Sequence, residues 1–448
     1  MTTGNPWKLI FVFMLPLAIG NIFQQLYSMV DTIIVGQFVG VSALAAVGAT
    51  GGLMFFVMGM VQGAAAGFTI VTSQRFGAGD EKGVRSSVAH CIILSVVYTL
   101  LLTVISLAMT GPIMQLINTP DDIYEDAVTY IRIIFIGYAA TMLYNLTAGI
   151  LRAMGDSRRP LYFLLISTGL NIVLDLVFIL VFHMGVAGAA WATVLAQLVA
   201  GLLCLWYMAR NYPILKLSRE DFSWSWHFAG EHLKIGLPMA FQFSVIAIGI
   251  LFVQRAVNAY GTAAVAGYTA GNKVELLLQQ PMIALGTAMA TYCGQNLGAR
   301  RYDRIRKGML VSLGIGLGCC VFALIFNLVA GRAMTSLFID AESVDDVEEV
   351  LWYGTKFLQI ALYFYIPLQF VYIFRSSLQG LGDGINPFVG STIELVARAV
   401  FSIWLPPLIG YIGVAISAPL AWLGAGVYLI IVFYIRLGRM EKRVRLEA

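Results

Sequence analysis

Two acidic residues lie inside long apolar stretches, where an unpaired charge is costly. Asp31 lies near the end of the apolar run 9–38, and no Lys or Arg follows it before Arg75. Asp175 lies within a second apolar run, 160–182. An isolated charge at membrane depth costs about 3 kcal/mol on insertion scales. We therefore expect these carboxylates to be kept because they bind and release a proton or a small cation.

Further polar residues are expected beside this acidic pair. At 1.5 Å per residue, Asp31 lies about 35 Å along the first run, close to the outer leaflet. Side chains four or seven positions apart share one face of a helix, which places two amides beside the two acids. The residues at this depth or on these faces are Asp31, Asp175, Asn171, Thr193, Gln24 and Tyr130.

The oxygen atoms of this set suit two kinds of coupling ion. Carboxylate, amide, hydroxyl and phenol oxygens are ligands that a hard cation such as Na⁺ prefers. Two neighbouring carboxylates equally suit H⁺, because protonation relieves their mutual repulsion. The alternative is that Asp31 ends a helix at the interface and that Asp175 pairs with Arg132. The sequence leaves Na⁺ and H⁺ both open.

Composition defines the elements that must position these residues. Of 448 residues, 59% are hydrophobic and 12% charged, against about 25% charged in soluble proteins. The chain is therefore predicted to be an all-α polytopic membrane protein, embedded in a lipid bilayer. A net charge of +4, scattered through loops, gives no support for nucleic acid binding. No cofactor is expected. The twelve predicted spans are 9–38, 42–74, 87–111, 127–151, 160–182, 187–209, 234–257, 263–293, 308–331, 350–374, 386–408 and 412–435.

Basic residues set the expected orientation. Alternate loops carry Lys and Arg, as at 300–307 and in the tail 436–448, whereas the intervening loops near 121–126 and 340–349 are acidic. Positively charged loops stay in the cytoplasm. We therefore expect both termini to be cytoplasmic in a multi-pass protein of the plasma (inner) membrane.

The chain also repeats itself. LPLAI at 15–19 returns as LPMAF at 237–241, and SQRFGAGD from Ser73 returns as GQNLGARR from Gly294. Six spans per repeat give both halves the same orientation. The expected domains are an N-terminal six-helix lobe (1–210), a cytoplasmic linker (211–231), a C-terminal six-helix lobe (232–435) and a basic cytoplasmic tail (436–448).

These motifs give the chain a specific family resemblance. It resembles the multidrug and toxic compound extrusion (MATE) transporters in VDTIIVGQF around Asp31, in the two loops above, and in GYTAGNKVE at 267–275. The resemblance implies two pseudo-symmetric lobes and export of amphipathic, often cationic organic compounds in exchange for Na⁺ or H⁺. It also implies a cation site in the N-terminal lobe, formed by Asp31, Asn171, Asp175 and Thr193, with Gln24 and Tyr130 as neighbours. If the coupling ion is a metal ion, these four residues would bind Na⁺.

The two halves differ at this site. By the repeat offsets, Asp31, Asn171 and Asp175 correspond to Val253, Arg398 and Ser402, so the acidic pair exists only in the first half. The second half offers its own polar residues as a candidate substrate cavity, namely Glu275, Glu394, Arg398 and Gln242. The alternative for Glu394 is a structural ion pair with Arg398, four positions later.

The sequence thus favours an ion-coupled multidrug efflux antiporter that acts as a monomer on small organic substrates. The alternative is a lipid-linked oligosaccharide flippase of the same superfamily, which would need basic residues along its cavity; Lys273, Lys356 and Arg398 are the candidates. A channel lacks a filter motif. An enzyme is not expected, because the four histidines show no metal-ligand spacing and no nucleophile elbow is present.

Overall fold

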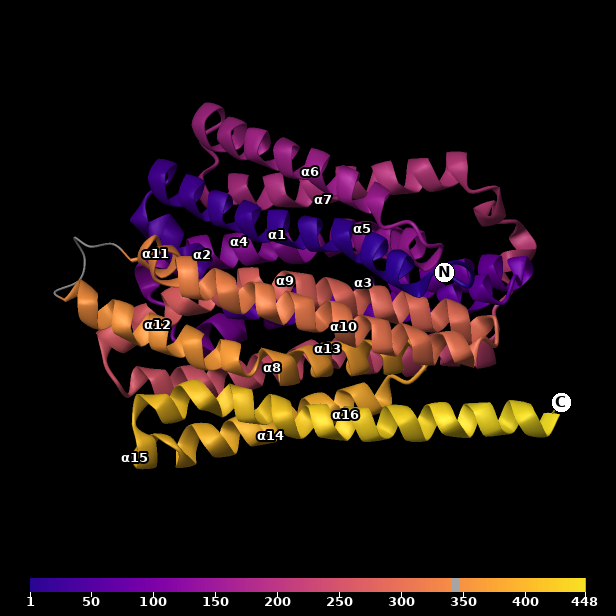
Figure 1. Cartoon of the computed structure of the whole chain (residues 1–448). Helices are drawn as coiled ribbons and strands as arrows, with labels where there is room; N and C mark the ends of the chain where they lie inside the picture. The colour runs from indigo at the N-terminus through magenta and orange to yellow at the C-terminus, as the bar shows by residue number, and fades with distance from the viewer. Residues whose placement is uncertain (340–345, 448) are drawn as a thin grey trace. The chain divides into compact units, whose positions relative to one another are not determined.

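The computed structural model describes residues 1–339 and 346–447, and within these ranges the secondary structure is helical, with no strand. The helices of the first half are α1 (Pro6–Phe38), α2 (Val41–Gly77), α3 (Glu81–Leu116), α4 (Asp121–Ile136), α5 (Tyr138–Ala153), α6 (Arg158–Leu176) and α7 (Gly185–Asn211). Those of the second half are α8 (Trp226–Asn258), α9 (Thr262–Gly298), α10 (Tyr302–Phe326), α11 (Arg332–Ser336), α12 (Val347–Tyr363), α13 (Tyr365–Gly380), α14 (Ile385–Trp404), α15 (Pro406–Ile409) and α16 (Tyr411–Glu447). Figure 1 shows the helices in chain order, from indigo at the N-terminus to yellow at the C-terminus.

The predicted spans correspond to these helices. Eight helices of the described chain are long and apolar enough to cross a membrane, and two bent pairs, α4 with α5 and α12 with α13, raise this number to ten. The remaining two spans are α9 and α14, which carry charged residues inside apolar sequence: Lys273 and Glu275 in α9, Glu394 and Arg398 in α14. The prediction of an all-α polytopic membrane protein with twelve spans in two halves is confirmed.

Two spans are bent where the sequence predicts continuous runs. The α4–α5 pair turns by 43° at Gly137 and the α12–α13 pair by 57° at Phe364. A Cβ atom on Gly137 would meet a methyl group of Val194 at 2.2 Å, so this close approach to α7 requires glycine. Pro367 explains the second bend, because its ring excludes the carbonyl four residues earlier, that of Tyr363.

Two further spans contain a π-helical turn near one end. One, η1 (Val177–Val181), directly follows α6, and the other, η4 (Asn327–Gly331), follows α10. A π turn holds one residue more than an α turn and is frequent at functional sites. The first of these turns begins two residues after Asp175.

The chain divides into two compact units. Unit 2 is Ile19–Ser244, and unit 1 combines Met1–Ala18 with Val245–Ala448. The boundaries fall inside α1 and α8 rather than in the polar segment 211–231. Each unit has its own principal hydrophobic core, and the N-terminal turns of α1 pack in the core of unit 1. The predicted limits of lobes, linker and tail remain a prediction.

The polar segment before α8 is anchored to α3 within unit 2. Arg85 lies 3.5 Å from the carboxylate of Asp221, and the backbone N–H of Ser225 donates to His90 Nε2 at 3.2 Å. The backbone N–H of Ser218 holds the pKa of Asp221 below its usual value. A carboxyl group with a lowered pKa stabilises the folded state at pH values above its unfolded-state pKa of about 3.9. This stabilisation is lost as the pH falls through the folded-state pKa. This anchor is therefore intact at neutral pH.

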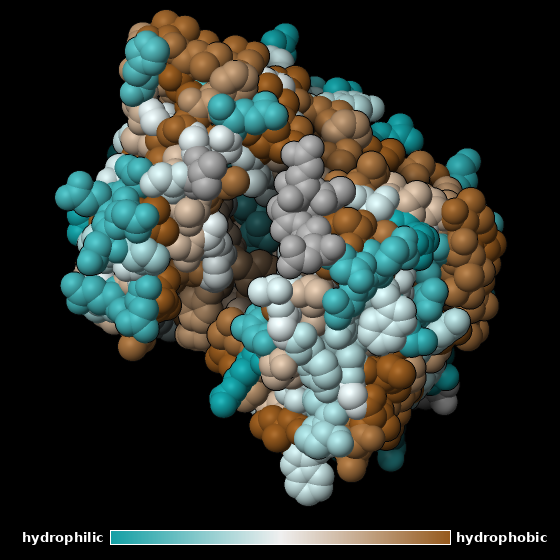
Figure 2. All heavy atoms as spheres, turned by 90° about the vertical axis from the view of Figure 1, so that its left-hand side faces the viewer, coloured by the Kyte–Doolittle hydropathy of each residue, from teal (hydrophilic) through white to brown (hydrophobic). Residues whose placement is uncertain are grey.

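Large apolar side chains remain exposed on the helix flanks. Leu100, Val104 and Leu310 each expose more than half of their surface. Figure 2 shows hydrophobic residues along much of the visible flank and hydrophilic residues gathered on the end that faces the viewer. Exposed apolar flanks with polar ends are expected of helices that lie in lipid.

Candidate functional site

Unit 2 brings together side chains from α1, α4, α6 and α7. The carboxyl groups of Asp31 on α1 and Asp175 on α6 are close enough to interact directly. Tyr27, one turn before Asp31, shares a hydrogen bond of 3.3 Å with Thr193 on α7. Tyr27 and Tyr130 both lie within electrostatic range of the two carboxylates. We call Asp31, Asp175, Asn171, Thr193, Tyr27 and Tyr130 the acidic cluster.

Half of the acidic cluster is buried and half is half-buried, and many of its polar atoms have no partner among the described residues. Asp175 is fully buried and Asn171 is 1% exposed. Both carboxylate oxygens of Asp175, Oδ1 of Asp31 and both amide atoms of Asn171 are buried without a hydrogen-bond partner among the described residues. Such atoms cost about 1–3 kcal/mol each if nothing satisfies them. Several buried oxygens without donors are the kind of ligand that a small positive ion requires.

Within residues 1–339 and 346–447, no basic side chain neutralises this pair. Neither Asp31 nor Asp175 forms an ion pair with any described residue. Arg132, the alternative partner of Asp175, is exposed, whereas Asp175 is fully buried. The alternative of an Asp175–Arg132 pair is therefore wrong, because the two side chains lie in different environments.

Three positions differ from the set expected from the sequence. Gln24 is exposed and forms no hydrogen bond with the acidic cluster in the described chain, although it lies on α1. Gln197 was not foreseen: it lies one turn beyond Thr193 on α7, and its Oε1 is buried without a partner. Tyr27 was missed as well. Its signal in the sequence is its spacing of four residues before Asp31, which places it on the same helix face.

The charged residues of unit 1 are arranged differently. Glu394 on α14 is bound by two guanidinium groups, from Arg398 one turn later and from Arg375 on α13 at 2.8 Å. All three side chains are at least 89% buried. The structural pairing of Glu394 with Arg398 is therefore observed, and Arg375 adds a second arm.

Glu275 takes part in a separate network. It accepts a hydrogen bond of 2.9 Å from Gln279 on the same helix, and Tyr372 of α13 donates to Gln279 at 3.0 Å. Arg398 lies within electrostatic range of Glu275. Lys273 lies over the ring of Phe338, 5.4 Å from its centroid, rather than against Glu275.

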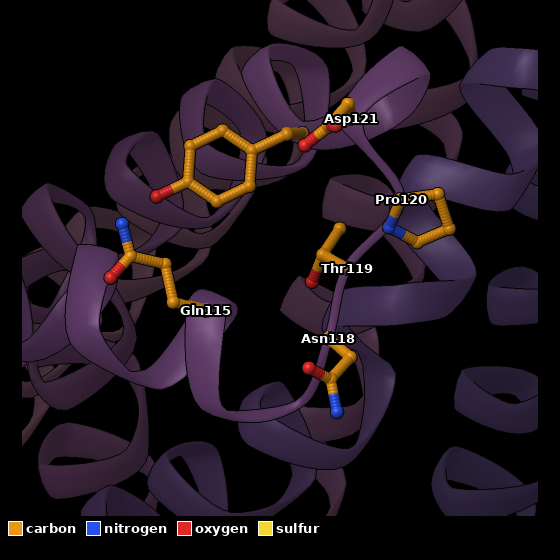
Figure 3. A pocket seen from close by; sticks show the side chains of 6 residues that line it. Gln115, Asn118, Thr119, Pro120 and Asp121 are labelled. Carbon is orange, nitrogen blue, oxygen red and sulfur yellow. The ribbon is translucent and has the colours of Figure 1, made fainter.

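The fourth residue of the expected substrate cavity, Gln242, is buried in unit 2. Hollows lie elsewhere in the described chain. One of about 430 Å³, shown in Figure 3, lies between the end of α3 and the start of α4. Gln115, Thr119 and Asp121 line it, and none of the expected site residues does.

Fold and site together define a duplicated, polytopic helical membrane protein with a buried, unneutralised acidic cluster in its first half. The sequence profile of the MatE family matches residues 16–177 and 238–404, one segment in each half. The chain belongs to the MatE family.

Relatives across the chain carry related names. The probable multidrug resistance protein YpnP of Bacillus subtilis is 28% identical over 410 residues, which cover 90% of both proteins. The multidrug export protein MepA of Staphylococcus haemolyticus is 24% identical over 397 residues, covering 88% of this chain and 84% of its own.

Solved structures share the fold. A structure described as the outward-facing conformation of a multidrug resistance MATE family transporter has a TM-score of 0.91 at 24% identity, covering 98% of this chain and 97% of its own. A superfamily transporter from Pyrococcus furiosus, described as having reverse polarity of its binding pocket, gives 0.90 at 24% identity, with the same coverage. At this identity the likeness concerns the fold.

Proposed function

We propose that this protein is a transporter rather than an enzyme, and that it exports small, amphipathic organic compounds in exchange for Na⁺ or H⁺. The observation that carries the proposal is the acidic cluster, in which Asp31 and Asp175 lie together with no basic partner in the part of the chain that the structure describes. The names of its relatives, multidrug resistance and export proteins, support the substrate class.

The acidic cluster suits a coupling ion for an electrostatic reason. Two carboxylates at short range in a low-dielectric site repel each other, and a proton or a cation between them removes that repulsion. For Na⁺, Asp31, Asn171, Asp175 and Thr193 would supply oxygen ligands. Coupling then requires that the ion and the organic substrate stabilise different conformations of the protein.

The membrane setting follows from the charge pattern of the loops. Basic loops and the basic tail favour cytoplasmic termini, which supports a protein of the plasma (inner) membrane. The carboxylates then lie toward the outer half of the bilayer. Inward movement of the coupling ion would drive outward movement of the substrate, by a single chain acting as a monomer.

The test uses purified protein in lipid vesicles loaded with ethidium, with the pH gradient and the Na⁺ gradient imposed separately. We expect one of the two gradients to drive ethidium movement against its concentration gradient. Movement that neither gradient changes would contradict ion coupling while leaving the membership of the family untouched.

The Asp31→Asn variant tests the site. It keeps the shape of the side chain and removes the charge, so gradient-driven ethidium transport should fall to the level of protein-free vesicles. Asp126→Asn, which alters an exposed carboxylate on α4, is the matched control and should transport normally. Normal transport by a correctly folded Asp31→Asn variant, as judged by size-exclusion chromatography, would overturn this site.

A further inference from the structure

A second cavity is formed within unit 1, whereas the acidic cluster belongs to unit 2. It measures about 380 Å³ and lies between the first turn of α14 and the last third of α16. Figure 1 shows these two helices running alongside each other. The residues that line the cavity, which we call the α14–α16 pocket, are Asn386, Val432, Ile435, Arg436, Arg439 and Met440.

One arginine of the α14–α16 pocket is already positioned. Arg436 Nη1 lies 3.0 Å from the carboxylate of Asp383, which is 4% exposed. The backbone and side-chain nitrogens of Asn386 also donate to Asp383, at 3.1 and 2.6 Å. Asp383 thus fixes Arg436, whose Nε–H is buried with no partner among the described residues. About one third of the Arg436 side chain remains exposed.

The second arginine adds an uncompensated charge. Arg439 is exposed and forms no ion pair with a described residue. Glu441, two positions later, is already held by Arg306 through two hydrogen bonds of 2.7 Å. Arg436 and Arg439 contribute two positive charges, and Asp383 contributes one negative charge. The pocket therefore carries an excess positive charge.

The remaining wall of the pocket is apolar and faces outward. Ile435 is 49% exposed, and Ile431 and Val427, one and two turns earlier on α16, are more exposed still. In a membrane protein such a stripe lies against acyl chains. The α14–α16 pocket therefore lies where the lipid-facing stripe ends and the arginines begin, which is the level of the headgroups.

We infer that the α14–α16 pocket binds the phosphodiester headgroup of an anionic phospholipid. Arg436 and Arg439 bind the phosphate, because guanidinium groups match its oxygens in geometry and charge. The acyl chains lie along Val432 and Ile435. Basic pockets between membrane helices on the positively charged side bind anionic headgroups in this manner. Free phosphate offers the same oxygens but nothing for the apolar wall.

The test measures the thermal unfolding midpoint of the purified full-length protein in detergent with added lipid. Phosphatidylglycerol should raise the midpoint more than phosphatidylcholine at equal concentration, because a ligand that binds only the folded state stabilises it. Inorganic phosphate at the same concentration should leave the midpoint unchanged. Equal effects of the two lipids, or an effect of inorganic phosphate as large as that of phosphatidylglycerol, would overturn the inference.

Charge variants locate the site. Arg439→Gln should weaken the response to phosphatidylglycerol by about tenfold in concentration, the usual effect of losing one charge-assisted contact. Lys442→Gln removes the same charge from the same end of α16 but lies outside the pocket, so its response should match the unaltered protein. Equal losses in the two variants would indicate nonspecific attraction to the charged tail and contradict a defined pocket.

Arg436→Gln alone would strand the buried Asp383, so a double variant covers that position. Arg436→Gln with Asp383→Asn removes both charges together, so that neither a cation nor a buried anion is left without its partner. It should fold and lose the preference for phosphatidylglycerol over phosphatidylcholine. A double variant that folds and keeps this preference would contradict a role for Arg436. None of these measurements depends on transport, so a negative result here would not contradict the ion-coupled mechanism, and a failure of that mechanism would not contradict lipid binding.

Discussion

The two halves of this chain carry buried acidic residues at related places but treat them in opposite ways. In unit 2, Asp31 and Asp175 lie together with no basic partner among the described residues. In unit 1, Glu394 is held between Arg375 and Arg398. By the repeat offsets, Arg398 occupies the place of Asn171.

This difference shows how one duplicated scaffold can support two kinds of charge. A buried carboxylate between two guanidinium groups has its charge satisfied permanently, and its role is structural. A pair of carboxylates without a partner has its charge satisfied only when an ion arrives, and it can respond to that ion. Burial alone therefore does not separate a structural carboxylate from a candidate coupling site, and the presence or absence of a counter-charge is what distinguishes the two halves.

The largest effect is expected from Glu394→Gln. This change leaves two buried guanidinium groups without an anion, and breaking a buried pair from one side costs about 3–5 kcal/mol. We expect a strong fall in the thermal unfolding midpoint and in the yield of folded protein. An unfolding midpoint equal to that of the unaltered protein would show that Glu394 is not the structural anion of unit 1.

The matched control is Asp175→Asn, the same chemical change at an unpaired carboxylate. It removes a buried charge that no described residue neutralises, so stability should stay the same or rise in the absence of a coupling ion. Transport driven by the ion gradient should be lost. If Asp175→Asn destabilised the protein as much as Glu394→Gln, the contrast between the two halves would fail.

A smaller effect is expected from Gly267→Ala, which tests packing in the two halves. A Cβ atom there would lie 2.3 Å from the carbonyl oxygen of Val350, so α9 and α12 would have to separate. Overpacking of this kind costs about 1–3 kcal/mol. The equivalent position in the first half is already alanine, Ala46.

Gly314 on α10 provides the control for this glycine. It has no atom within 4 Å of the position a Cβ would occupy. Gly314→Ala should therefore leave the unfolding midpoint unchanged or raise it, since alanine favours the helix by about 0.5–1 kcal/mol. A fall as large as that of Gly267→Ala would show that the close approach of α9 and α12 is not the cause.

The smallest effect is expected at an exposed pair of unit 2. Arg75 binds Glu231 at 2.9 Å, with about a third of each side chain exposed. Arg75→Ala should cost less than about 1 kcal/mol, because exposed ion pairs contribute little. The coupling energy from a double-mutant cycle with Glu231→Ala should shrink further in high salt. A coupling energy above about 1 kcal/mol that does not change with salt would show that this exposed pair behaves like the buried ion pairs of Glu394.

Much of this architecture can be predicted from the sequence, because membrane spans depend on total apolar content over a long window. The twelve spans, the duplication and the acidic pair on the first and fifth spans all follow from such patterns. The bends could not be predicted in the same way. The bend at Gly137 depends on Val194, a residue of another helix, and hydropathy carries no information about that contact.

The site was less accessible to prediction for a related reason. The sequence gives the depth of a residue along its span but not the rotation of one helix against another. Gln24 has a suitable depth and is nevertheless exposed, whereas Gln197 and Tyr27 have buried polar atoms or a partner in another helix. Arg375 was missed as the second partner of Glu394 because the two lie on different spans.

The π-helical turn after α6 has a mechanical consequence. Its extra residue rotates every side chain beyond it by about 100° relative to an uninterrupted α-helix. Deleting one residue within Val177–Val181 would thus leave Asp175 facing Asp31 and swing the chain from Phe182 onward to another side of the helix. The π-helical turn therefore sets the direction in which the chain enters the loop before α7, while the direction of the Asp175 side chain stays the same.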